Sequence, residues 1–265
     1  MTPAQHQSAA AALLQAEATG QQTGLLSIAY PDITMDDAYA IQKQVVAGKL
    51  AQGEDVIGWK IGLTSRAMQQ ALNIDIPDSG VLTSSMRFDT GDTVPAGRFI
   101  QPRVEAEIAF VMKSPLGGAD VTRDDVIAAT DYVAPSLEIL DTRVLRADPA
   151  TGAARKVFDT IADNAANAGI VLGSERHAAD SDLRWVGAIV TANGTVEETG
   201  LGAGVLNDPV ESVVWLARRI AQYGQQIEAG QVILSGSFIR PIECPAGTRI
   251  EADFGSFGRV DLQFG

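Results

Sequence analysis

Apolar residues recur every three or four positions in several segments of the chain, which is the spacing of one face of an α-helix. One such pattern covers residues 34–52. At its start, Thr34 and Asp37 resemble an N-terminal capping box, and Gly53 fits the helix end. The same signals predict helices over residues 65–73, 123–133 and 209–224. The alanine-rich N-terminal stretch is also predicted to be helical.

Short apolar or β-branched runs between turn residues predict strands, which dominate the second half of the chain. The runs "VIGWKIG" (56–62) and "SLEIL" (136–140) are typical of buried strands, and a longer strand is expected over 98–113. The pair Asn193-Gly194 in "WVGAIVTANGTVEETG" predicts a tight hairpin. The remaining strand signals, which include the glycine-punctuated C-terminus, show no regular alternation with helices.

These elements predict an α+β fold, in which a mixed, largely antiparallel sheet curls into a roll or barrel and helices flank it. A soft boundary lies near residue 55. Residues 1–55 are expected to form a small helical N-terminal region, and residues 56–265 the mixed-β domain that carries the functional site. Both belong to one structural unit overall, because 265 residues suffice for one large core.

Composition and charge narrow the classes of protein. The formal net charge of −13 disfavours a nucleic-acid binder, which needs basic surface to replace counterions. No apolar run is long enough to span a bilayer, and the N-terminus lacks the basic region of a signal peptide. The expectation is therefore a cytoplasmic protein without a nucleic-acid or membrane partner. A single cysteine, Cys244, cannot form an internal disulfide.

Histidine is scarce, since the chain has only His6 and His177. A histidine-based catalytic triad or zinc site would have to use one of these two residues. A metal site built from carboxylate oxygens, which suits Mg²⁺, Mn²⁺ or Ca²⁺, is the simpler expectation.

Three glutamates in apolar strands are the candidate metal ligands. In "QPRVEAEIAF", Glu105 and Glu107 would share one strand face about 7 Å apart, because side chains alternate along a strand. Two buried carboxylates this close repel each other unless one is protonated or a cation neutralises both. Glu138 in "SLEILD" is the candidate third ligand. The alternative is a half-exposed strand with an ordinary polar face.

Lys60 and Asp78 are candidates for acid–base chemistry. Lys60 lies inside the apolar run "GWKIG", where burial would shift its pKa, although a lysine at a sheet edge could also extend to water. Asp78 lies in "IPDSG", a predicted turn where aspartate is also common for conformational reasons.

Several weaker candidates could bind a substrate. Arg103 could bind an anionic group or pair with a surface acid. Asp163 and Asn164 in "ADNAANAG" could belong to a site or cap a helix. The segment "SGSF" with Ser237 could form a bulge or an anion site of backbone amides.

Several motifs occur together in one order: "GWKIGLTS", "PRVEAEIAF", "LEILDTR", "FDTIADNAANAG", "ILSGSFIRP" and "ADFGSFGRVDLQF". Over roughly residues 25–265 they resemble the hydratase/decarboxylase branch of the fumarylacetoacetate hydrolase superfamily. The resemblance implies a lyase that depends on Mg²⁺ (or Mn²⁺). Trp59 departs from the histidine found in some members. The matching residues are Glu105, Glu107 and Glu138 as metal ligands and Lys60 and Asp78 as the acid–base pair.

The resemblance also implies a reaction. A hydratase would add water to a 2-oxo-enedioate of seven carbons in aromatic catabolism, with Arg103 or Arg143 near the distal carboxylate. The alternatives are a 2-oxopent-4-enoate hydratase, a 4-oxalocrotonate decarboxylase, a catalytically silent partner of another member, and an acylpyruvate-type hydrolase. The intact candidate residues argue against the silent partner, and the missing catalytic histidine argues against the hydrolase. A homo-oligomer, with a decamer as one form, is the expected assembly.

Overall fold

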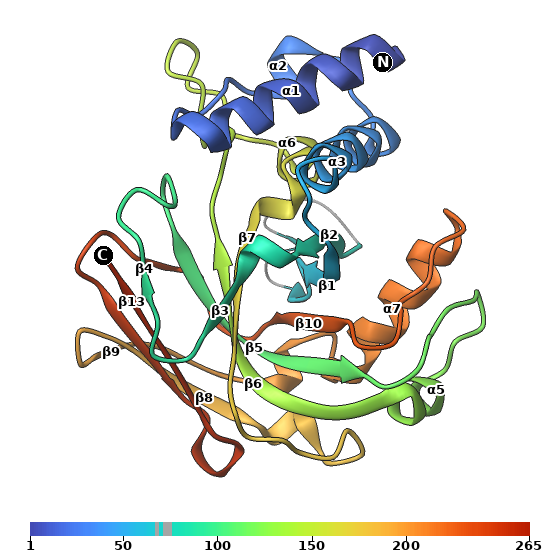
Figure 1. Cartoon of the computed structure of the whole chain (residues 1–265), viewed down its shortest axis with the longest axis vertical. Coiled ribbons are helices and arrows are strands. Elements are labelled where there is room, and N and C mark those ends of the chain that lie inside the picture. Colours follow the sequence, from blue (N-terminus) through green and yellow to red (C-terminus); the bar gives the residue numbers. More distant parts are fainter. Residues whose placement is uncertain (67–68, 71–75) are drawn as a thin grey trace.

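The computed structural model describes residues 1–66, 69–70 and 76–265, and most of the predicted helix over 65–73 lies outside these residues. A helical layer that contains the N-terminus lies over two β-sheets (Figure 1). Thr2, Thr34 and Thr122 each cap a helix through a capping box. The α-helices are α1 (Pro3–Thr19), α2 (Leu26–Ala29), α3 (Met35–Leu50), α5 (Arg123–Ala129), α6 (Val157–Ala162) and α7 (Pro209–Ala221).

The larger sheet has the strand order β2-β1-β10-β5-β6-β7-β3, with β11 paired to β5. Most of its pairs are antiparallel, but β1 runs parallel to β10 and β3 runs parallel to β7. Its strands are β1 (Val56–Gly62), β2 (Asp78–Thr83), β3 (Arg87–Asp89), β5 (Arg103–Met112), β6 (Thr130–Leu140), β7 (Asn167–Leu172), β10 (Val232–Ser237) and β11 (Ile242–Glu243).

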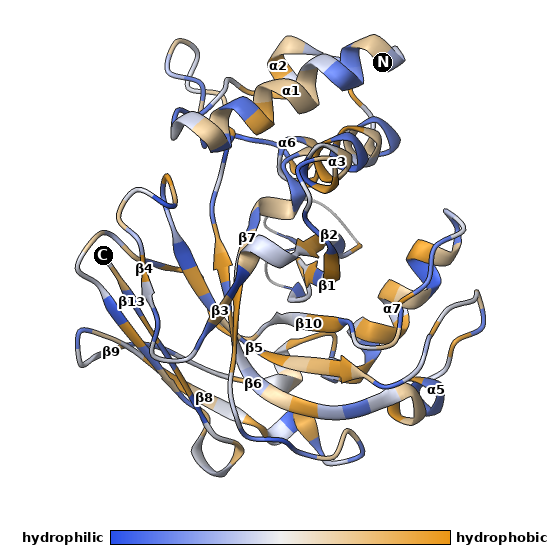
Figure 2. Ribbon diagram, viewed as in Figure 1, coloured by the Kyte–Doolittle hydropathy of each residue, from blue (hydrophilic) through white to orange (hydrophobic). Residues whose placement is uncertain are grey.

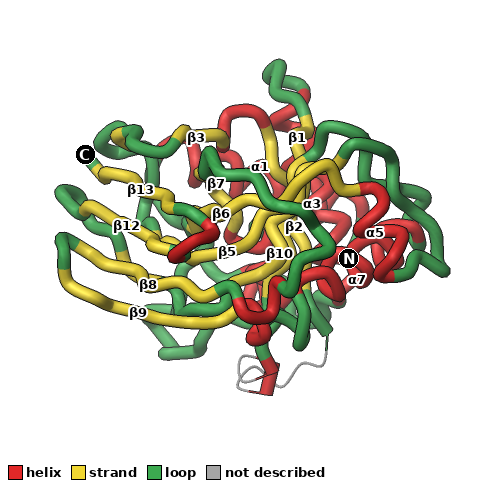
Figure 3. The backbone as a smooth tube through the Cα atoms, turned by 90° about the horizontal axis from the view of Figure 1, so that it is seen from below, coloured by secondary structure: helices red, strands yellow, loops and turns green. Residues whose placement is uncertain are grey.

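The smaller sheet has the order β4-β13-β12-β8-β9, and Figure 3 shows β13, β12, β8 and β9 running side by side. Its strands are β4 (Thr93–Val94), β8 (Gly187–Ala192), β9 (Thr195–Leu201), β12 (Arg249–Asp253) and β13 (Arg259–Phe264). The predicted mixed α+β class is confirmed, as is the hairpin at Asn193-Gly194. Within the described ranges the strands form two open sheets and no closed barrel.

Strand β5 is covered on both faces, which explains its long apolar run. Val104, Ile108 and Phe110 point into the main hydrophobic cluster, while Ala109 on the other face packs in a smaller one. Figure 2 shows hydrophobic colour along β5, β1 and β2. The second face of β5 also carries Arg103 and the two glutamates, so a polar site lies directly on the core sheet.

The helical layer has its own hydrophobic cluster. It joins residues of α1, α2 and α3 with Ile161 and Ala162 of α6 and with Val144. Helix α6 therefore packs on the N-terminal helices although it is far from them in sequence. The division of the chain at residue 55 stays a prediction.

One predicted helix is shorter than expected. The pattern over 123–133 predicts a single helix, but α5 ends at Ala129 and β6 begins at Thr130. Thr130, Tyr132 and Val133 are β-branched or aromatic residues that favour a strand, and they pair with β5. Among the described residues, no helix combines the length and the apolar character needed to cross a membrane.

Candidate metal centre and active site

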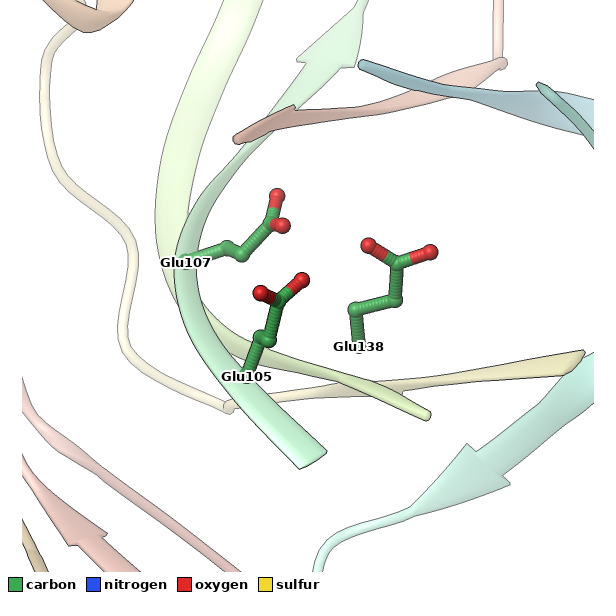
Figure 4. A group of neighbouring side chains, drawn as sticks. All are labelled: Glu105, Glu107 and Glu138. Carbon is green, nitrogen blue, oxygen red and sulfur yellow. The ribbon is translucent and has the colours of Figure 1, made fainter. Parts of the chain in front are cut away.

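Three glutamates lie together on one face of the larger sheet (Figure 4). Glu105 and Glu107 are two residues apart on β5, so their side chains point the same way. Glu138 on β6 lies directly opposite Glu105 in the antiparallel register and joins them on that face. One carboxylate oxygen from each residue lies within 4.8 Å of the other two.

Burial makes this cluster costly when all its members are charged. Burial, and then the charge of Glu138, raises the pKa of Glu105 to about 8. Burial and the two other carboxylates raise the pKa of Glu107 well above its usual range. Burial also raises the pKa of Glu138 to about 7, against the opposing charge of Lys60. Three carboxylates this close do not all ionise without a compensating cation.

The oxygens of the cluster suit a divalent metal ion. Oε1 of Glu107 and both carboxylate oxygens of Glu138 are buried and have no hydrogen-bond partner in the described part of the chain. Oε2 of Glu107 accepts a hydrogen bond of 2.8 Å from the backbone N–H of Gly236, which fixes this carboxylate and leaves Oε1 free. Because Mg²⁺, Mn²⁺ and Ca²⁺ prefer oxygen ligands, the three glutamates could hold such an ion.

Lys60 reaches the same cluster from β1. Its Nζ lies 3.4 Å from Oε1 of Glu138 and donates a hydrogen bond of 3.2 Å to the carbonyl oxygen of Ala165. Burial alone would lower the pKa of Lys60, but the charges of Glu138 and Asp78 outweigh burial and raise it. The side chain is only 4% exposed, so it does not extend to water as a lysine at a sheet edge would.

Asp78 is close to Lys60, although the sequence places it in a turn. It opens strand β2 and pairs with Gly62, while Lys60 pairs with Gly80. A methyl group on Gly62 would lie 2.3 Å from Oδ1 of Asp78 and 2.9 Å from Nζ of Lys60, so only glycine leaves room for both. Burial raises the pKa of Asp78 against the opposing charge of Lys60. The structure thus brings both candidate acid–base groups to the carboxylate cluster.

A cavity of about 620 Å³ opens at this cluster, within the range of about 300–1,000 Å³ typical of small-ligand sites. Among its lining residues are Lys60, Asp78, Glu105, Arg103 and Ser237. The hydroxyl of Ser237 donates to the carbonyl oxygen of Ile239 (2.9 Å) and accepts from its N–H (3.1 Å), which closes a tight turn at the cavity wall.

Arg143 and Asp163 do not line this cavity, because they bind each other inside the protein. The guanidinium of Arg143 donates to the Asp163 carboxylate and also to the backbone carbonyls of Asp163 (2.7 Å) and Asn167 (3.1 Å). Burial raises the pKa of Asp163 to about 6, against the charge of Arg143. These contacts support a structural role for the pair.

A strained turn follows this ion pair and supports Lys60. Asn164, Ala165 and Ala166 have φ angles of 51°, 54° and 57°, the left-handed region that side chains other than glycine rarely adopt. The Asn164 side chain accepts a hydrogen bond from the N–H of Val81 (2.8 Å) and donates one to its carbonyl (2.9 Å). This clamp on β2 holds the Ala165 carbonyl against Lys60, which makes Asn164 a positioning residue.

We expect Asn164→Ala to lower the free energy of unfolding by about 2 kcal/mol, because it removes two hydrogen bonds and takes the side-chain acceptor from the buried N–H of Val81, while Asn167 still donates to the Val81 carbonyl (3.2 Å). Urea denaturation measures this loss. The exposed Gln222→Ala is the control and should change the free energy by less than about 0.5 kcal/mol. Equal stability of Asn164→Ala and the control would contradict the clamp.

The segment "SGSF", in which the sequence indicated a bulge or a site of backbone amides, breaks the register of β10 with β5 and lies at the cluster, whereas sequence reasoning did not single out Thr64, Arg155 or Lys156. Gly236 has a φ of 112° and turns its N–H toward Glu107, and Thr64 packs where its side chain would be. Arg155 and Lys156 also line the cavity. In the sequence, Arg155 and Lys156 are marked only as two adjacent cations just before the motif "FDTIADNAANAG".

Comparison with known proteins gives close relatives over the whole chain, although no family model matches the sequence. The chain is 48% identical to 2-oxo-hept-4-ene-1,7-dioate hydratase from Escherichia coli over 98% of its own length and 97% of the relative's. It is 39% identical to 2-keto-4-pentenoate hydratase from Paraburkholderia xenovorans (strain LB400) over 100% and 96%. The solved 4-oxalocrotonate decarboxylase from Pseudomonas putida G7, complexed with magnesium and adipate, has a TM-score of 0.93, 32% identity and coverage of 100% and 99%.

The two open sheets define a fumarylacetoacetate hydrolase-like fold. Fumarylpyruvate hydrolase from Pseudomonas aeruginosa shares this fold at a TM-score of 0.55 and 11% identity, over 78% of this chain and 88% of its own. The chain belongs to the family of 2-oxo acid hydratases and decarboxylases.

Proposed function

We propose that the chain is a divalent-metal-dependent hydratase that converts 2-oxo-hept-4-ene-1,7-dioate into 4-hydroxy-2-oxoheptanedioate. The observation that carries the proposal is the cluster of Glu105, Glu107 and Glu138 beside Lys60 and Asp78 at one cavity. The name of the relative from Escherichia coli, 48% identical over nearly the whole chain, supports the choice of substrate.

Mg²⁺, or Mn²⁺, is the proposed metal, and the three glutamates are its proposed ligands. The related decarboxylase from Pseudomonas putida G7 was solved with magnesium in one structure and with calcium in another, which supports a hard divalent ion. When bound, such an ion would hold the 2-oxo acid end of the substrate and polarise its C2 carbonyl.

The groups of the chain itself would then move protons. The reaction transfers a proton from C3 to C5, adds water at C4 and returns a proton to C3, so the product gains one water. Lys60 is held as an ammonium by the neighbouring carboxylates and can donate a proton, whereas Asp78 can accept one. The structure fixes both groups through buried strands, which limits the geometries in which they meet the substrate.

With 2-oxo-hept-4-ene-1,7-dioate as substrate, we expect a product that is heavier by one water and carries ¹⁸O from labelled water at C4. Loss of substrate, measured by chromatography, follows the turnover, and mass spectrometry identifies the product. A product lighter by CO₂ would assign the chain to the decarboxylases. They are the second candidate, because the structure of the chain matches that of the decarboxylase from Pseudomonas putida G7 with a TM-score of 0.93. Faster turnover of 2-oxopent-4-enoate would assign it to the pentenoate hydratases.

We also propose that the chain forms a homo-oligomer, of which a decamer is one form. Exposed apolar side chains on the outer face of β8 and β9 support this assembly: Ile189 is 51% exposed and Val196 is 56% exposed. Trp185, just before β8, is 74% exposed. Apolar side chains gathered in this way are typical of a subunit interface, and sedimentation of the purified chain measures the assembly.

A further inference from the structure

Cations gather at the cavity although the chain is strongly acidic. The net charge is −13, yet four cations of the cavity lining lie close together in the sequence or the sheet. One lies at the start of β5, and three lie in the segment between β6 and α6. A local excess of one charge in a cleft attracts a ligand of the opposite charge. The four cations are Arg103, Arg146, Arg155 and Lys156.

Two of these cations already have an acid partner. Glu243 accepts hydrogen bonds from both Arg103 (2.7 Å) and Arg146 (2.9 Å). Of the residues that the structure describes, none forms an ion pair with Arg155 or Lys156. The whole lining carries six cations, which include Lys60 and Arg240, and three carboxylates, Asp78, Glu105 and Glu198, so positive charge is in excess on the cavity wall.

Arg155 is held in place but is not neutralised. Its side chain donates one hydrogen bond, of 2.8 Å, to the hydroxyl of Thr142, and its backbone N–H donates to the carbonyl of Arg146 (2.9 Å). Since a guanidinium has five N–H donors, most of its donors remain for a ligand in the half-buried position that it occupies. Burial lowers the pKa of Arg155 against the opposing charges of Asp163 and Asp159, neither of which forms an ion pair with it.

The cavity thus has two chemically different parts. Glu105, Glu107 and Glu138 would hold the metal and the 2-oxo acid group, whereas Arg155 and Lys156 present free positive charge elsewhere on the wall. We propose that Arg155, with Lys156 beside it, binds the second carboxylate of a dicarboxylic substrate and so selects dicarboxylic over monocarboxylic 2-oxo acids. This inference rests on the proposed function, because it deepens the choice of substrate at the same site.

Two saturated ligands test the inference without turnover. 2-Oxoheptanedioate and 2-oxoheptanoate have the same chain length and differ in the distal carboxylate, and neither has a double bond to hydrate. Calorimetry with the Mg²⁺-loaded chain should show tighter binding of the dioate. Arg155→Gln should raise the Kd of the dioate by about tenfold or more, which is the loss of affinity expected when a hydrogen bond to a charged group is removed. It should change the Kd of the monoacid by less than about twofold, because that ligand has nothing to offer the guanidinium.

Two variants separate recognition from charge and folding. Arg155→Lys keeps the charge and should retain part of the preference for the dioate. Arg240→Gln removes a charge from the same cavity, but Arg240 is 81% exposed and already pairs with Glu198 (2.8 Å), so the preference should persist. Loss of the preference in Arg240→Gln as well would indicate a general effect of charge and overturn the inference.

The outcomes distinguish this inference from the proposed function. Binding with a preference that Arg155→Gln removes, but without hydration of the enedioate, would leave the inference standing and the proposed function wrong. Hydration together with an unchanged preference in Arg155→Gln would overturn the inference alone. Equal weakening of both ligands in Arg155→Gln would show that Arg155 acts on the shared end of the ligand or on the fold, and binding of neither ligand to the unaltered chain would overturn both.

Discussion

Removal of divalent metal with EDTA is expected to abolish turnover, and Mg²⁺ or Mn²⁺ should restore it. Oε1 of Glu107 and both carboxylate oxygens of Glu138 are buried without a hydrogen-bond partner among the described residues, and the Lys60 ammonium, 3.4 Å from Oε1 of Glu138, is one positive charge beside three carboxylates, which is costly unless a further cation occupies the site. Glu107→Gln keeps the shape of the side chain and an acceptor for the N–H of Gly236, but removes one charge. We expect this variant to weaken metal binding by at least about tenfold.

Calorimetry with the metal-free chain measures this affinity, and the exposed Glu211→Gln is the control. Thermal unfolding of metal-free Glu107→Gln should occur at an equal or higher temperature than that of the unaltered chain, because the variant removes repulsion between carboxylates. Weaker metal binding in a protein that is no less stable would separate ligand loss from misfolding. Full activity in metal-free buffer would contradict the metal site.

Metal binding should also strengthen as the pH rises. Burial and the neighbouring Glu138 raise the pKa of Glu105 to about 8, so the metal-free cluster holds a proton at neutral pH. A bound cation must displace this proton, and the apparent affinity therefore increases through the range near pH 7 to 8. The same calorimetry, repeated in buffers of different ionisation enthalpy, measures the proton released.

Lys60→Met is expected to lower kcat by about 10²-fold or more. Methionine keeps most of the apolar stem in the buried strand β1 but removes the ammonium that lies 3.4 Å from Glu138. Metal affinity should be equal or higher, since a positive charge beside the proposed ligands is lost. The variant therefore separates loss of acid–base chemistry from loss of the metal.

Steady-state kinetics at saturating Mg²⁺ measure the effect, and the exposed Lys113→Met is the matched control. Circular dichroism and urea denaturation establish that the variant is folded. Turnover close to that of the unaltered chain would mean that the ammonium of Lys60 only stabilises the fold through Ala165 and Glu138.

The sequence by itself determined the local structure that carries the site. Thr34 and Asp37 form the predicted capping box, since a cap needs only residues three positions apart. Strand β1 over Val56–Gly62 agrees with the predicted run. The period of two along β5 places Glu105 and Glu107 on one face, because successive side chains of a strand alternate. Capping and side-chain alternation depend on residues a few positions apart, so they can be predicted from the local sequence.

Only the tertiary structure decided which of these residues meet. The register of β5 with β6 sets Glu138 opposite Glu105, and a shift of one residue would turn Glu138 to the other face. Arg143 had the charge of a substrate ligand, but folding buries it against Asp163 and brings Arg155 to the cavity instead. Strand register and ion-pair choice depend on contacts between distant segments, where many pairings have similar local energies. The order of residues along the chain does not fix such contacts, so the packed fold selects the partners of each charge.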